Sequence, residues 1–114
     1  MNAINPIYKQ IVAPLAQYYD DPKTVEVRLN GPGRIVVDRR GEGKKLIEDP
    51  ALTQGAIEQL CKNLSNVRGL NFDPDNEPNL STALDEGHRF ECLVGSSVRS
   101  GLRLAIRCKP PFTP

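Results

Sequence analysis

The chain has 114 residues, of which 39% are hydrophobic and 25% are charged, with 15 Lys and Arg against 14 Asp and Glu. This length and composition are typical of one ordinary globular domain. The net charge of +1 argues against charge-driven binding to nucleic acid, and no apolar run approaches the ~20 residues of a membrane-spanning helix.

The first predicted element is a helix that begins at Asn5-Pro6. Asparagine can cap a helix, and proline suits its first position because no backbone N–H is needed there. Pro14 predicts a kink, since it removes one backbone hydrogen bond and clashes with the preceding turn. Apolar side chains at helical spacing predict the face that packs on the sheet or on a neighbouring subunit: Ile7, Ile11, Leu15 and Tyr18.

Three short strands are predicted next, over residues 25–29, 34–39 and 44–48. Glycine-containing turns at 31–33 and 41–43 separate them, and such short connections indicate an antiparallel meander. In the first strand, alternation with charged residues predicts which side chains face the core: Val25, Val27 and Leu29.

A second helix is predicted after this meander, because the hydrophobic period changes. Thr53, or alternatively Asp49-Pro50, can open the helix, and Gly69 can close it. The apolar face is expected to contain Ile57, Leu60, Cys61, Leu64 and Val67.

The last third of the chain is again predicted to be β, with strands over residues 80–84, 88–94 and 102–107. The proline-rich end after these strands is typical of a linker. Runs of strands rather than strand–helix alternation predict an α+β fold with a mainly antiparallel sheet of about six strands. Two helices would cover one face of this sheet, and the other face would stay polar.

The sequence lacks familiar catalytic and metal-binding patterns. It contains no Gly-x-x-x-x-Gly-Lys-Ser/Thr phosphate loop, no Gly-x-Ser-x-Gly and no His-Glu-x-x-His. Cys61, Cys92 and Cys108 are widely spaced and His88 is the single histidine, so no metal site and no catalytic residue is predicted. We expect the cysteines to be reduced and to pack as small hydrophobic residues.

Arginines are the remaining candidates for a binding site, with Arg89, Arg99, Arg103 and Arg107 all in the last part of the chain. Strand alternation places Arg89, Arg103 and Arg107 on the face opposite their apolar neighbours. If their strands are adjacent, the guanidinium groups could converge on one surface, where their planar forks suit phosphate oxygens. The alternative is that arginine serves only solubility and edge protection on an exposed strand face.

Residues 79–90, NLSTALDEGHRF, resemble a Leu-Ser-x-x-Leu-x-(Asp/Asn)-Gly-x-Arg segment of a known family. The family is that of the hexameric traffic ATPases of type IV secretion and conjugation systems, and the segment lies in their N-terminal domain. The matching residues are Leu80, Ser81, Leu84, Gly87 and Arg89. Residues 25–42, VEVRLNGPGRIVVDRRGE, are similar to the family's first strand pair, and residues 102–111, LRLAIRCKPP, to the strand that leads toward the ATPase domain. The family often has lysine where this chain has Cys108, with Lys109 following.

The resemblance implies a PAS-like domain over residues 1–109, followed at 110–114 by the start of a linker to a RecA-like ATPase domain. ATP would bind between the two domains, with Mg supplied only through the RecA-like domain and with Arg89 and Arg107 directed at the phosphates. No catalysis is expected from these residues alone, because the phosphate loop would belong to the absent RecA-like domain.

The resemblance also implies partners and a location. The full-length protein would form a homo-hexamer that powers substrate translocation or pilus assembly, without direct contact to nucleic acid. It would be cytoplasmic and peripheral to the inner membrane, in contact with other components of the secretion machinery there. The amino-terminal residues show no secretory signal, which agrees with this location.

The sequence leaves two alternative functions open. One is a stand-alone PAS-like sensory or protein-interaction module. The other is a small nucleic-acid-binding domain that uses the arginine face, against which the near-neutral charge and the 5% aromatic content both count.

Overall fold

The computed structural model describes residues 5–95, 98 and 101–110. Arg99 and residues 111–114 of the expected linker lie outside these described residues. The elements, in chain order, are α1 (Pro6–Tyr19), β1 (Thr24–Leu29), β2 (Arg34–Arg39), β3 (Gly43–Glu48), α2 (Gln54–Arg68), β4 (Asn79–Ala83), β5 (Arg89–Val94) and β6 (Leu102–Arg107).

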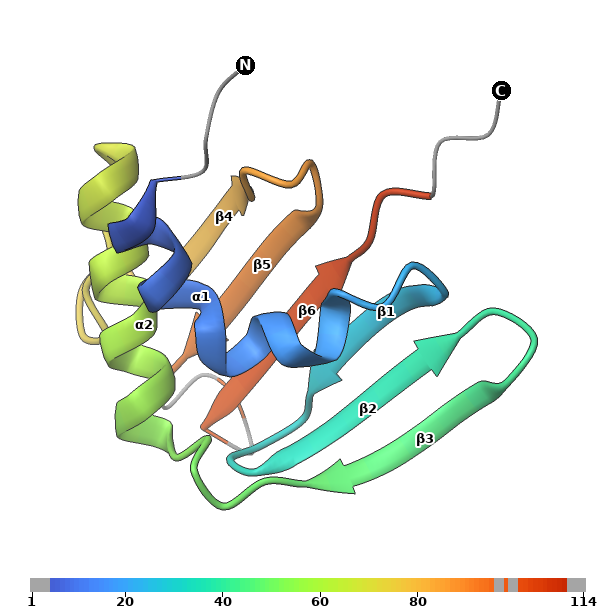
Figure 1. Ribbon diagram of the computed structural model, residues 1–114. Coiled ribbons are helices and arrows are strands. Elements are labelled where there is room, and N and C mark those ends of the chain that lie inside the picture. Colours follow the sequence, from blue (N-terminus) through green and yellow to red (C-terminus); the bar gives the residue numbers. More distant parts are fainter. Residues whose placement is uncertain (1–4, 96–97, 99–100, 111–114) are drawn as a thin grey trace.

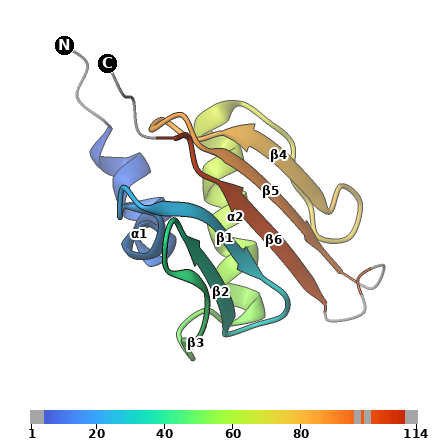
Figure 2. The same ribbon diagram turned by 90° about the vertical axis from the view of Figure 1, so that its right-hand side faces the viewer.

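All six strands form one antiparallel sheet in the order β3-β2-β1-β6-β5-β4. Each half of the sheet is a three-stranded meander, and the two halves join where β1 pairs with β6 at the centre. Both helices lie on the same face of the sheet, so among the described residues the other face carries no helix (Figures 1 and 2). The predicted α+β fold is therefore confirmed.

Helix α1 begins as predicted, because the Asn5 side chain accepts a hydrogen bond of 2.8 Å from the Ile7 N–H and Pro6 takes the first helical position. Figure 1 shows the helix bent partway along its length, as the internal Pro14 predicts.

The buried face of α1 is turned by one residue from the predicted one. Its fully buried side chains are Tyr8, Val12, Leu15 and Tyr19. Ile7 is 61% exposed, so it does not pack on the sheet, the first of its two predicted places, while Ile11 and Tyr18 pack at the edge of the core. The helix takes this orientation because it buries two tyrosine rings whose hydroxyl groups still find polar partners.

The start of β1 departs from simple alternation. A β-bulge lies between Thr24 and Glu26, so Thr24 is buried and Val25 is 42% exposed. The prediction for Val25 was therefore wrong, and that for Val27 and Leu29 is confirmed.

Helix α2 has the predicted ends. The Thr53 hydroxyl accepts a hydrogen bond of 3.1 Å from the Ala56 N–H, and Gly69 ends the helix with a left-handed φ of 68°. Val67 is 47% exposed and Ser65 is buried instead, with its hydroxyl donating to the Lys62 carbonyl at 2.7 Å, so the prediction for Val67 was wrong.

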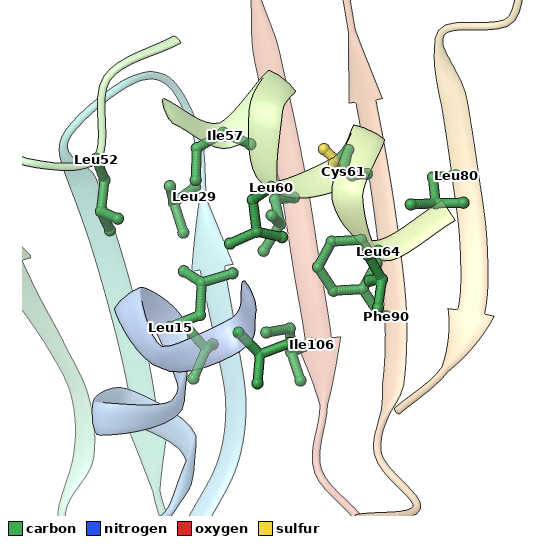
Figure 3. Close-up of a cluster of buried hydrophobic side chains, with 14 of the residues drawn as sticks. Leu15, Leu29, Leu52, Ile57, Leu60, Cys61, Leu64, Leu80, Phe90 and Ile106 are labelled. Carbon is green, nitrogen blue, oxygen red and sulfur yellow. The ribbon is translucent and has the colours of Figure 1, made fainter. Parts of the chain in front are cut away.

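The core lies between the two helices and the inner face of the sheet. Figure 3 shows Leu15 of α1 and Leu64 of α2 among side chains of the strands, including Phe90 and Ile106. Cys61 and Cys92 are free and buried, and Cys108 is free and half-buried, as expected for reduced cysteines. Within the described residues, no helix combines the length and apolar character needed to cross a membrane.

Candidate functional site

The sheet face that lacks helices carries a row of charged side chains, one from each of five neighbouring strands. Its members lie directly opposite one another in the register of the sheet, in the order Lys44, Asp38, Glu26, Arg107 and Arg89. They face away from the core because the next residues along three of these strands, Val27, Phe90 and Ile106, are buried.

Arg107 and Arg89 are neighbours at one end of this row. They are direct cross-strand partners at the ends of β5 and β6, and their side chains are 64% and 74% exposed. The prediction that strand alternation brings them to one outer surface is confirmed. Like charges placed directly opposite in a sheet are destabilising, so a bound anion would relieve this pair.

Carboxylates accompany both arginines. Glu26 Oε2 lies 3.7 Å from Arg107 Nε, and Glu91 Oε1 lies 4.0 Å from Arg89 Nε. Arg89 also donates to the Ser81 hydroxyl at 3.4 Å. The contacts of Arg89 to Glu91 and Ser81 are long and exposed, so they restrain this guanidinium only weakly, and both arginines keep donors for a ligand.

Arg103 shares the outer face but not the row. It lies opposite Leu93, four residues and thus roughly 13 Å along β6 from Arg107. Both arginines nevertheless line a shallow hollow of about 310 Å³ on this face, together with Glu26, Arg28 and Asn30. The alternation of residues 25–29 already predicted an outward Glu26 and Arg28, but their position beside Arg107 depends on the pairing of β1 with β6.

The turn before Arg89 is fixed by helix α1. The Tyr8 hydroxyl donates to Glu86 Oε1 at 2.5 Å and the Tyr19 hydroxyl donates to Glu86 Oε2 at 3.0 Å. The Asp85 N–H donates to the Tyr8 hydroxyl at 3.0 Å. Burial raises the pKa of both phenols above their usual range, and the nearby Glu86 carboxylate adds to the shift, so both tyrosines remain neutral donors.

Helix α2 holds the same turn from its other side. Arg68 Nη2 lies 2.5 Å from Asp85 Oδ1 and donates to the Ala83 carbonyl at 2.9 Å. Its guanidinium carbon also lies 5.4 Å from the centroid of the Tyr8 ring. The turn is therefore restrained by both helices.

His88 links this turn to the chain that leaves β6. Its Nδ1 accepts a hydrogen bond of 2.9 Å from the Lys109 N–H, and its ring packs edge-on against Tyr19 at 5.2 Å. Gly87 has a φ of 96°, and a Cβ there would lie 3.0 Å from the Lys109 side chain. The segments that present Arg89 and Arg107 are thus tied to one another, a role for His88 that the sequence did not indicate.

The described residues contain no group of three or more His, Cys, Asp or Glu side chains that could hold a metal ion. What the outer face offers is a set of guanidinium groups at one end of the sheet, two of them in direct register. Such a set can bind an anion with several oxygens, such as a phosphate chain.

Comparison with known proteins agrees with the fold. No protein-family model matches the chain. The chain is 29% identical to Protein VirB11 of Agrobacterium fabrum (strain C58) over 113 aligned residues, which cover 91% of this chain and 30% of that protein. The VirB11 proteins of Rhizobium radiobacter and of Agrobacterium tumefaciens (strain 15955) match to the same extent.

A solved structure gives the same result. The chain superimposes on the crystal structure of the VirB11 ATPase from the Brucella suis type IV secretion system, in complex with sulphate, with a TM-score of 0.79 and 25% identity. This match covers 93% of the chain and 31% of the Brucella protein.

The chain is thus homologous to ATPases of type IV secretion systems, and the part it matches is their N-terminal domain. The particular ATPase to which it is similar, in sequence and in structure, is VirB11. The chain spans about 30% of the length of the curated relatives that it matches.

Proposed function

We propose that this domain closes over ATP bound to a RecA-like domain of the same protein, as part of a type IV secretion or conjugation ATPase. Arg89 and Arg107 contact the nucleotide phosphates from the side opposite the phosphate-binding loop. The loop itself and the Mg ion that accompanies ATP belong to the RecA-like domain.

The observation that carries this proposal is the direct register of Arg89 and Arg107 on the exposed face of the sheet. Two guanidinium groups in opposed positions gain most when a multiply charged anion lies between or above them. The chain also leaves β6 immediately after Arg107, so a domain that follows would begin close to the pair.

Arginine at this position acts on the reaction by electrostatic stabilisation. Charge develops on the phosphate oxygens as the terminal phosphoryl group is transferred, and a guanidinium held nearby stabilises that charge. The bonds from α1, α2 and His88 to the turn and to Lys109 hold the two arginine-bearing strand ends together, so little reorganisation is needed when the domains close.

The assembled protein is proposed to be a homo-hexamer on the cytoplasmic side of the inner membrane, in contact with other components of the secretion machinery. Its ATP turnover would power substrate translocation or pilus assembly. Direct binding to nucleic acid is not part of this proposal, because the net charge of +1 offers little attraction for a phosphate backbone.

The test is ATP turnover in the complete ATPase. Arg89→Ala and Arg107→Ala are each expected to lower turnover by roughly a hundredfold to a thousandfold, the range found when one charge-stabilising donor is removed. Arg103→Ala is the matched control, because it removes the same side chain from the same strand as Arg107 but outside the register pair. Wild-type turnover by Arg89→Ala and Arg107→Ala in an intact hexamer would refute the role in phosphate binding.

A further inference from the structure

Glu26 occupies an unusual place on the outer face of the sheet. It lies on the central strand β1, and its side chain is only 16% exposed, although this face carries no helix. Its two carboxylate oxygens contact different arginines: Oε1 lies 3.1 Å from Arg28 Nε, and Oε2 lies 3.7 Å from Arg107 Nε. One carboxylate therefore joins two guanidinium groups across the β1–β6 pair.

Both arginines meet Glu26 through Nε. A guanidinium has five N–H donors, so the donors on the terminal nitrogens stay available when Nε alone is engaged. Among the described residues, neither Arg28 nor Arg107 makes any further side-chain hydrogen bond or ion pair. Their side chains are 48% and 74% exposed, so a ligand in the shared hollow can reach both.

The charges on the neighbouring strands favour a contact of Glu26 with Arg107 on β6. Asp38 lies directly opposite Glu26 on β2, and like charges in opposed positions repel. Lys44 lies directly opposite Asp38 on its other side, on β3. Glu26 therefore gains by contacting Arg107 on β6 rather than remaining beside Asp38.

We propose that Glu26 is a positioning residue which holds Arg107 and Arg28 as the two arms of one phosphate-binding site, and that Arg28 is a further ligand-binding residue of that site. The identification of the ligand as a nucleotide rests on the function proposed above. The positioning itself requires only that the site bind a phosphate chain.

The test uses inorganic tripolyphosphate and the 114-residue chain, followed through the Nε–H signals of the arginine side chains in ¹⁵N correlation spectra. Wild-type protein is expected to bind the probe weakly, with shifts in the Nε–H signals of Arg28 and Arg107. Glu26→Gln is expected to speed the solvent exchange of the Arg107 Nε–H. It should also weaken binding by about twofold to fivefold, the scale of one partly exposed ion pair.

Whether Glu26→Gln weakens or tightens tripolyphosphate binding distinguishes a positioning role of Glu26 from a purely electrostatic one. Glu26→Gln removes a negative charge near the anion, so a purely electrostatic role would make binding tighter. Glu91→Gln is the matched control, because it makes the same change on the same face beside Arg89, where the contact is longer at 4.0 Å. It should leave the Arg107 signal unchanged and should not weaken binding.

A second variant covers the possibility that Glu26→Gln perturbs the fold. Glu26→Asp keeps the charge but shortens the side chain, so it should also weaken binding if reach matters. Tighter or unchanged binding by both Glu26 variants, or no tripolyphosphate binding by the wild type, would overturn the positioning role. If binding behaves as expected but Arg107→Ala does not change turnover of the complete ATPase, the proposed function fails while the positioned site stands.

Discussion

Replacing Tyr8 with phenylalanine tests whether helix α1 fixes the turn that presents Arg89. The substitution keeps the buried ring and its contact with Arg68, and it removes only the hydroxyl group. That hydroxyl donates to Glu86 at 2.5 Å and accepts from the Asp85 N–H at 3.0 Å. Two polar contacts of the turn are therefore lost with one oxygen atom.

The expected loss follows from the kind of contact removed. A hydrogen bond to a charged group contributes roughly 1.5–3 kcal/mol, and the Asp85 N–H would also lose its partner. Because Tyr19 still donates to Glu86, we expect a loss of about 2 kcal/mol in the free energy of unfolding. For a domain of this size that corresponds to a Tm lower by roughly 8 °C.

The assay is urea unfolding of the 114-residue chain followed by circular dichroism, with a thermal melt alongside. Tyr18→Phe is the matched control on the same helix, since its hydroxyl donates to Asp49 at 2.5 Å from a half-buried site where water can replace it. We expect the control to cost about 1 kcal/mol or less. If Tyr8→Phe proves no more destabilising than Tyr18→Phe, the turn is not held by α1 in the way described.

Three further predictions concern catalysis, pH and the turn. The 114-residue chain alone should not turn over ATP in a phosphate-release assay, because its sequence holds no phosphate-binding loop, and turnover that survives repurification would contradict this. Burial raises the pKa of Cys108 from 9.0 to about 11 and of Tyr18 from 10.0 to about 12. The unfolded chain loses these protons first, as it does those of the buried Tyr8 and Tyr19, so urea unfolding should show full stability below pH 9 and a decline between pH 9 and 12. Tyr18→Phe should reduce only part of the decline above pH 10, and a flat profile would be inconsistent with these shifts. Gly87→Ala should cost about 1–2 kcal/mol by the same assay, since φ is 96° there and a Cβ would meet the Lys109 side chain at 3.0 Å, whereas an unchanged midpoint would show that the turn relaxes freely.

Local sequence patterns predicted the helices and strands of this fold well, because the signals that define them involve only residues close together in the chain. Asn5-Pro6, Thr53 and Gly69 mark helix ends through capping chemistry that involves only neighbouring residues. Alternation also placed Arg89 and Arg107 on the outer face, since side-chain direction along a strand is a local property.

The predictions that were wrong concern features that depend on more than the local sequence pattern. The buried face of α1 turned by one residue because Tyr8 and Tyr19 reach Glu86, which is 78 and 67 residues away. The bulge after Thr24 exposes Val25, and no periodicity reveals such an insertion.

Which residues come together in the candidate site could likewise not be predicted from the sequence alone. Glu26 and Arg28 were recognisable as outward residues of a strand, but not as neighbours of Arg107. Only the pairing of β1 with β6, from the two ends of the chain, brings them together. His88 likewise gains its contact with Lys109 only because the ends of β5 and β6 lie side by side.

The most direct measurement for the account as a whole is a structure of the complete ATPase with a non-hydrolysable ATP analogue and Mg. The distance to determine is that from the guanidinium nitrogens of Arg89 and Arg107 to the nearest phosphate oxygen. We predict hydrogen-bonding distances of about 2.7–3.0 Å for at least one nitrogen of each arginine. An analogue bound with its phosphates beyond roughly 6 Å from both arginines, in a closed conformation, would contradict the proposed role of this face.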